Sequence, residues 1–171
     1  MEEKTKANNP SNRRIWLTGG LIGFAVGAIV CLVAIFAVMP SLMIVTKESK
    51  LSLDETVARL EESIVANGWV HLGTRDMNKS LAKHGIELKP RVRLVELCHP
   101  EYAKSILLTD RYIATMMPCT FAVWEGDNGK VYLSEMNMGL MAKLFGGNIA
   151  KVMGGKVVED EHRILSGLLK D

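Results

Sequence analysis

The chain opens with a long, unbroken apolar segment. Residues 15–39 contain no charged side chain, and Pro40 follows them. About 20 apolar residues can cross the hydrocarbon core of a bilayer as a helix, so the segment predicts one transmembrane helix over 15–39. A cleaved signal peptide is the alternative. Its apolar region is usually about 7–15 residues long, and the best cleavage candidate here places the bulky Ile35 at the −3 position, so an uncleaved anchor is favoured.

Beyond this segment, the hydrophobic positions predict about five strands and several helices. Strands are expected at 42–45, 69–74, 91–98, 119–125 and 130–135. A hairpin turn at 127–129 joins the last two. Ser52 and Glu55 have the spacing of a capping box, which begins a helix that Asn67-Gly68 ends. Shorter helices are expected at 77–84 and 101–108. This order predicts an α+β domain rather than a doubly wound α/β domain.

The last third of the chain has a helical pattern that two glycine pairs, Gly146-Gly147 and Gly154-Gly155, are expected to interrupt. A final amphipathic helix is predicted over about 157–169. An apolar stripe runs along 137–155, formed by Leu140, Met141, Leu144, Phe145, Ile149, Val152 and Met153. Core packing on the sheet is the preferred interpretation. A lid, a partner groove or a surface that dips into the bilayer are the alternatives.

The charge distribution bears on location and partners. The 21 basic and 19 acidic residues are unevenly placed: four basic and two acidic residues precede residue 41, which leaves 17 of each sign beyond it. A neutral domain without a basic stripe does not suit nucleic acid. Arg13 and Arg14 border the apolar segment, so the positive-inside bias predicts a cytoplasmic N-terminus over 1–14. Residues 41–171 would then lie outside, which in a bacterium is the periplasmic face of the inner membrane.

A stripe of small residues recurs every four positions within the apolar segment: Gly19, Gly23, Gly27 and Cys31. Such stripes let membrane helices approach closely. We therefore expect association with a second copy of the chain or with a subunit of a membrane complex, although glycine is also simply common in membrane helices.

Two short motifs bracket a predicted helix and precede the strand hairpin. They are Glu96-Leu97-Cys98-His99-Pro100-Glu101-Tyr102-Ala103 and Met117-Pro118-Cys119. From about residue 41 to the C-terminus, the chain resembles the domain of unknown function 302 family. The resemblance implies a curved antiparallel sheet with helices packed on it, similar to the TATA-binding-protein-like fold. It implies no established reaction, and it points to Cys98, Pro100, Pro118 and Cys119.

The two cysteines are the leading candidates for chemistry. If their strands pair antiparallel, as the family fold suggests, both sulfurs lie at the same end of the sheet. Cys98 and Cys119 could then be inert core residues, a disulfide or functional thiols. The thioredoxin-type C-x-x-C motif is absent. With His99, Met116 and Met117 nearby, the pair would also suit a soft metal such as Cu(I), or haem iron.

The remaining polar residues indicate no conventional enzyme. Hydrolase, kinase and metalloprotease motifs are absent. The acidic run at 159–161 opens the last helix, where it complements the helix dipole. The sequence therefore favours a non-catalytic, membrane-anchored binding or accessory module. Its candidate binding residues are Cys98, His99, Pro100, Met117, Pro118 and Cys119. A thiol-based redox or sulfur-handling protein is the first alternative, and a soft-metal or haem binder is the second.

Overall fold

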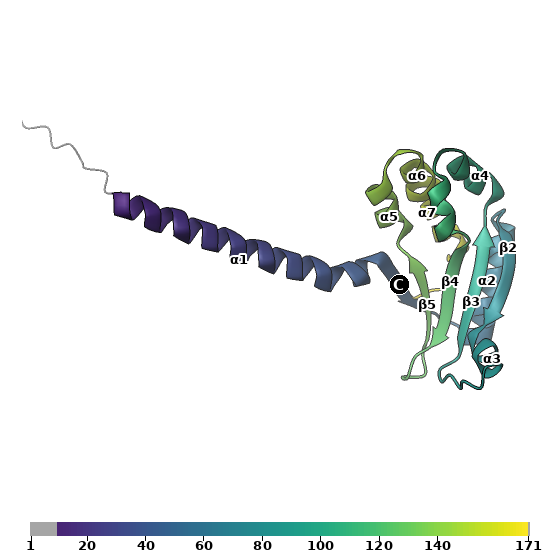
Figure 1. The fold of residues 1–171 in the computed structure, drawn as a ribbon. Helices are drawn as coiled ribbons and strands as arrows, with labels where there is room; N and C mark the ends of the chain where they lie inside the picture. The colour runs from purple at the N-terminus through teal and green to yellow at the C-terminus, as the bar shows by residue number, and fades with distance from the viewer. Residues whose placement is uncertain (1–9, 171) are drawn as a thin grey trace, which may run out of the picture. The chain divides into compact units, whose positions relative to one another are not determined.

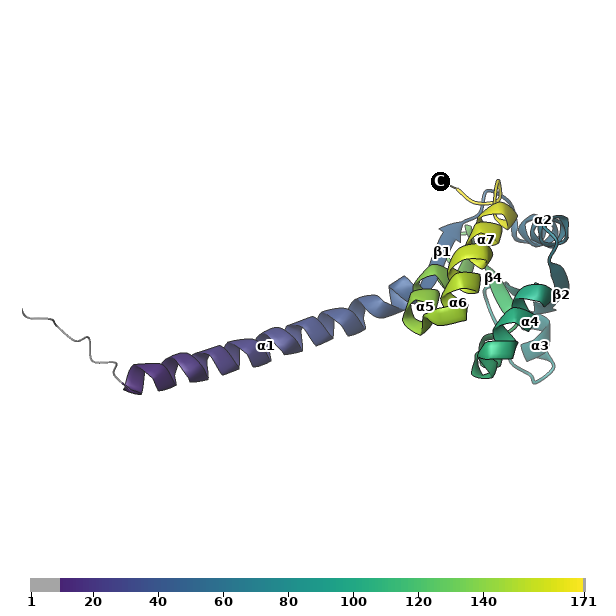
Figure 2. The same cartoon turned by 90° about the horizontal axis from the view of Figure 1, so that it is seen from above.

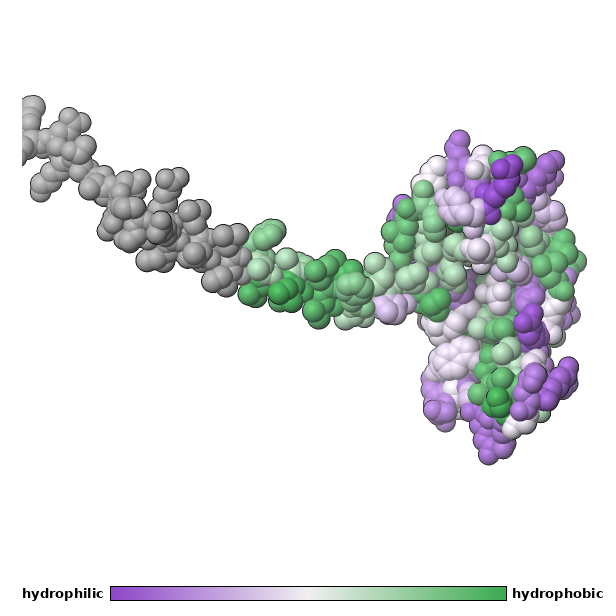
Figure 3. All heavy atoms as spheres, viewed as in Figure 1, coloured by the Kyte–Doolittle hydropathy of each residue, from purple (hydrophilic) through white to green (hydrophobic). Residues whose placement is uncertain are grey.

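The computed structural model describes residues 10–170, and their contacts divide the chain at Pro40 into two units. Helix α1, Pro10–Met43, contains the predicted transmembrane segment. Its stretch Gly23–Met43 is long and apolar enough to cross a membrane, and none of its most apolar window is buried. Figure 3 shows the mainly hydrophobic colouring of this part of the helix. The helix was expected to end before Pro40 but continues to Met43, since a proline can bend a helix without ending it. Residues 1–9 of the predicted cytoplasmic segment lie outside the described residues.

The second unit, from Ser41 onward, is built on an open five-stranded antiparallel sheet (Figure 1). The spatial order of its strands is β1-β5-β4-β3-β2. Their bounds are Ile44–Glu48 for β1, Val70–Asp76 for β2, Val92–Cys98 for β3, Cys119–Glu125 for β4 and Val131–Met136 for β5. The predicted α+β fold is confirmed. The first strand begins two residues later than expected, because α1 extends to Met43.

The core lies on one face of the sheet. Alternate residues of the central strands are buried there: Val95, Leu97, Phe121, Val123 and Leu133. Helix α2, Leu53–Ala66, packs against β2, β3 and β4 and supplies Leu53, Leu60 and Ile64 to the same core. Figures 1 and 2 show α2 and the C-terminal segment on the same side of the sheet. The helix begins with the predicted capping box, in which Ser52 accepts a hydrogen bond from the Glu55 amide and Glu55 accepts one from the Ser52 amide.

Short helices connect the strands at the two ends of the sheet. α3, Met77–Ala82, follows β2, and α4, Pro100–Thr109, follows β3. The 3-10 helix η1, Arg111–Met116, leads into β4. After β5 come α5, Met138–Phe145, α6, Gly147–Lys151, the π-helical turn η2, Val152–Val157, and α7, Val158–Ile164.

The C-terminal third corrects two predictions. The break at Gly146-Gly147 is present, with positive φ angles of 70° and 55°. Gly154-Gly155 is no break, because η2 passes through it and runs directly into α7. A Cβ atom at Gly154 would lie 2.8 Å from the Cβ of Ala142 in α5, so this glycine permits close packing of two helical segments. The last helix ends at Ile164 instead of near residue 169, and the chain then returns to form a bridge between Ser49 and Leu169.

The predicted apolar stripe along 137–155 divides into two parts. Its buried members are Met141, Ile149, Val152 and Met153, which join the core. Leu144 and Phe145 remain exposed, at 62% and 40% of their surface. Core packing therefore accounts for most of the stripe.

Candidate functional site

The two cysteines of the predicted motifs meet at one end of the sheet. Cys98 ends β3 and Cys119 begins β4, and these strands pair antiparallel with Cys119 opposite Leu97. Both are free thiols in this structure and line the same small cavity. Cys98 and Cys119 therefore lie at the same end of the sheet, as the family fold implied, and no disulfide joins them in this structure.

The electrostatic surroundings keep both thiols protonated. Burial, with smaller contributions from Glu161 and Cys98, raises the pKa of Cys119 to about 12. Burial also raises the pKa of Cys98. A reactive cysteine requires the opposite shift, because the thiolate is the nucleophile and the metal ligand. The raised pKa values do not favour a thiolate at either position, and the alternative of a thiol-based redox function stays a prediction.

An aromatic cluster closes this cavity. His99 stacks on Tyr102 with ring centroids 3.8 Å apart, and Trp69 meets both rings edge-on. The indole of Trp69 donates a hydrogen bond of 3.0 Å to Asp160 of α7, and the carboxylate of Asp160 also pairs with Arg163. The buried Nδ1 atom of His99 has no hydrogen-bond partner.

The other predicted binding residues are more dispersed. Met117 lines the cavity, Pro100 begins α4, Met116 packs against the core and Pro118 is exposed. The cavity has a volume of about 30 Å³, which is room for about one water molecule and not for haem. Among residues 10–170, no three His, Cys, Asp or Glu side chains are grouped as metal ligands.

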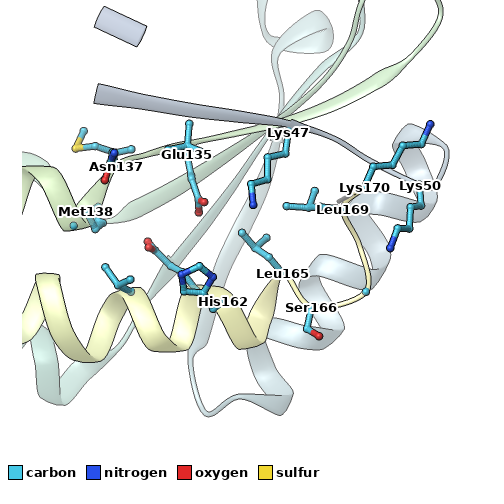
Figure 4. A pocket seen from close by; sticks show the side chains of 16 residues that line it. Lys47, Lys50, Glu135, Asn137, Met138, His162, Leu165, Ser166, Leu169 and Lys170 are labelled. Carbon is cyan, nitrogen blue, oxygen red and sulfur yellow. The ribbon is translucent and has the colours of Figure 1, made fainter. Parts of the chain in front are cut away.

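A much larger pocket lies between the β1–β5 edge of the sheet and α7 (Figure 4). Its volume is about 460 Å³. Figure 4 shows the Glu135 side chain extending from β5 toward α7, with Lys47 beside it on β1. Glu161 of α7 lines the same pocket. The remaining wall includes Val45, Asn137, Met138, Val158, Leu165 and Leu169.

The two carboxylates of this pocket are in an unfavourable environment for charge. Burial raises the pKa of Glu135 to about 7, although Lys47 acts in the opposite direction. Burial raises the pKa of Glu161 to about 8, and the charges of Glu135 and Asp160 add to that shift. The buried Oε2 atom of Glu135 has no hydrogen-bond partner. Within the described part of the chain, neither carboxylate forms an ion pair with a basic side chain.

A nearby carboxylate, that of Glu48, shows how basic side chains in this region pair with an acidic one. Glu48, three positions after Val45, forms ion pairs with Lys130 at 2.8 Å and with Lys170. These contacts hold the pKa of Glu48 below its usual value. Buried polar groups are nearly always paired, and an unpaired one needs an explanation. Glu135, whose buried Oε2 atom has no hydrogen-bond partner, is therefore the exception in this region.

The model of the domain of unknown function DUF302 matches residues 45–167, about the whole second unit. The chain belongs to this family. A crystal structure of an uncharacterized conserved DUF302 protein from Bacillus stearothermophilus has a TM-score of 0.63 and 19% identity. The match covers 72% of this chain and 95% of that chain, and it shows a shared fold. Among curated proteins, none matches the sequence.

The matched DUF302 region contains the small cavity and most of the lining of the larger pocket, which also includes Leu169 and Lys170. The cysteine motifs of the sequence indicated the small cavity. The sequence did not indicate the larger pocket, because Glu135 and Glu161 lie on different elements that are distant along the chain. One signal was available: the strand alternation of the DUF302 hairpin places Glu135 in phase with the buried Val131 and Leu133. The acidic run at 159–161 was expected only to complement the dipole of the last helix, but its Asp160 is buried, at 3% exposed.

The carboxyl groups of Glu135 and Glu161 in this DUF302 pocket can take up and release protons, and when ionised they can compensate a positive charge on a ligand. Two acceptor groups converge from β5 and α7 on a space large enough for a small molecule. No cysteine lines this pocket, and its single serine, Ser166, is exposed at the α7 end.

Proposed function

We propose that this DUF302 protein is a membrane-anchored binding module whose ligand occupies the pocket between β5 and α7. One observation carries the proposal: Glu135 presents a buried, unpartnered carboxylate oxygen beside a pocket of about 460 Å³. A buried acceptor without a partner is destabilising in the empty protein. A bound donor would remove that penalty.

The anchor is α1, whose most apolar window is not buried inside the protein. The basic residues before its uncharged stretch, including Arg13 and Arg14, support a cytoplasmic N-terminus and a periplasmic domain. Val45, in the pocket wall, follows Met43, the last residue of α1, by two residues, so the chain length keeps it within about 7 Å of the helix end. The ligand would therefore bind near the membrane surface.

Association through α1 is the second part of this proposal. Gly19, Gly23 and Gly27 lie within α1, and a Cβ atom at Gly23 or Gly27 would meet nothing within 4 Å. This stripe, with Cys31, leaves room for a second helix in a homo-oligomer or membrane complex. Replacing Gly23 with isoleucine should weaken cross-linking of full-length protein in native membranes, whereas Ile29→Leu should not. Unchanged cross-linking would exclude this interface.

Two experiments test the anchor and the binding function. Protease added to intact spheroplasts should digest the domain, and a protected domain would reverse the proposed topology. For binding, thermal stability of full-length protein in mild detergent would be followed with inorganic phosphate, acetate, glucose and ethanolamine as probes. At least one probe should stabilise the protein, and the effect should disappear in the Glu135→Gln/Glu161→Gln double variant. If no probe gives such an effect, the pocket is not a binding site for these classes of ligand.

A further inference from the structure

We propose that the pocket recognises a primary ammonium group, held between the carboxylates of Glu135 and Glu161. This inference rests on the proposed function and names the class of ligand for the same site. The ammonium group can come from a soluble amine or from an aminoethyl lipid headgroup at the membrane surface.

The hydrogen-bonding requirements of the pocket select a cation. An ionised carboxylate only accepts hydrogen bonds, and a primary ammonium group offers three donors. One such group can therefore satisfy the unpartnered Oε2 atom of Glu135 and reach Glu161 as well. An anion beside the Oε2 atom of Glu135 would face two carboxylates, and the lysines that line the pocket, Lys47 and Lys50, would have to compensate it.

The surrounding charges do not already compensate this pair. Lys47 faces Glu135 from β1 but forms no ion pair with it, and Lys170 is engaged by Glu48. On the α7 side, Asp160 and Glu161 are both acidic, and Asp160 is occupied by Trp69 and Arg163. Lys50 and His162 also line the pocket, and within the described chain neither forms an ion pair with Glu135 or Glu161. Among the described residues, no basic side chain therefore forms an ion pair with either carboxylate when it ionises.

A divalent metal ion fits this geometry less well. Calcium takes six to eight oxygen ligands, and magnesium requires near-octahedral coordination. In the described chain, no group of three His, Cys, Asp or Glu residues could hold a metal ion. The apolar wall formed by Val45, Met138 and Leu165 favours an organic cation with a short carbon body.

Binding of such a cation should release protons. Because the pKa of Glu135 is about 7 and that of Glu161 about 8, both carboxyl groups of the empty pocket are partly protonated at neutral pH. An ammonium group favours the ionised carboxylates, so its affinity should increase as both carboxylates ionise. We expect binding to strengthen at least about tenfold between pH 6 and pH 8.5.

The test compares ligands that differ only in their N–H donors. Ethanolamine and choline would be titrated by calorimetry into full-length protein in detergent at pH 8. Ethanolamine should bind at one site per chain, at least about tenfold more tightly than choline, whose quaternary ammonium has no N–H donor. Glu135→Gln and Glu161→Gln should each weaken ethanolamine binding at least about tenfold. Glu159→Gln, which removes an exposed charge on the same helix, should leave it unchanged.

The lipid source is distinguished in nanodiscs. If a headgroup is the ligand, phosphatidylethanolamine nanodiscs should abolish ethanolamine binding, whereas phosphatidylcholine nanodiscs should not. Equal binding in both nanodiscs identifies a soluble amine as the source. Equal affinity for ethanolamine and choline, or no binding of ethanolamine at pH 8, overturns the ammonium assignment. In that case, carboxylate-dependent stabilisation by phosphate, acetate or glucose would still support the binding module. Tryptophan fluorescence of each variant establishes that the buried Trp69 environment is intact.

Discussion

The strongest prediction concerns Glu135→Gln, which keeps the shape of the side chain and removes its charge. The free side chain has a pKa of 4.5, and burial raises it to about 7 in the folded protein. At about 1.4 kcal/mol per pKa unit, ionising Glu135 in the folded state costs roughly 3 kcal/mol. Part of that cost will be relieved by relaxation of the pocket, so we expect an effect of about 2–3 kcal/mol.

The sign follows from proton linkage. Between about pH 4.5 and pH 7, the folded protein retains a proton on Glu135 that the unfolded chain has released, so the free energy of unfolding falls as the pH rises. Glu161 extends the decline toward pH 8. Near pH 5, Glu135→Gln and the unmodified protein should therefore differ little. At pH 9 the variant should be the more stable by about 2–3 kcal/mol.

The measurement is urea denaturation of full-length protein in detergent micelles at several pH values, followed by tryptophan fluorescence. Trp69 is 4% exposed and reports on the core of the domain. Glu159→Gln provides the control, since a surface substitution on α7 should change stability by less than about 0.5 kcal/mol at every pH. Parallel pH profiles for the unmodified protein and Glu135→Gln would refute the argument, because they would show that the carboxylate is not desolvated.

Two further predictions concern the helix packing and the thiols. Gly154→Ala should lower the free energy of unfolding by about 1–3 kcal/mol, because its Cβ would lie 2.8 Å from that of Ala142. Gly155→Ala is the control, since a Cβ there meets open space and should not destabilise the protein. Equal effects of the two substitutions on urea denaturation would contradict the packing argument. In the folded protein at pH 7.5, Cys98 and Cys119 should react with iodoacetamide at least about tenfold more slowly than after denaturation, since burial raises the pKa of both thiols. Mass spectrometry would identify each site, and faster reaction in the folded state would favour the redox alternative.

Local features of the fold were predictable because they depend on neighbouring residues. The capping box of Ser52 and Glu55 forms as expected, and the strand predicted at 119–125 is present with those bounds. The turn at 127–129 joins β4 to β5, with Gly129 at a φ of 74°. Such features follow from side-chain to backbone hydrogen bonds and from backbone conformational preferences within a few residues.

The errors arise where contacts between distant residues decide the outcome. Gly154 was expected to interrupt a helix, but its role is the close approach to Ala142, twelve positions earlier. The final helix ends early because the last residues return to the sheet, where Leu169 meets Ser49. Local propensity contains no information about either contact.

The sequence by itself determined the apolar segment that can span a membrane, the α+β order of the elements and the family, through the motifs around Cys98 and Cys119. These depend on the length, periodicity and identity of nearby residues. Only the tertiary structure decided that Glu135 and Glu161 line one pocket, and that Lys47 lies near Glu135 without forming an ion pair with it. The physical reason is that desolvation and charge coupling depend on distances in space, which strand pairing and helix packing set together.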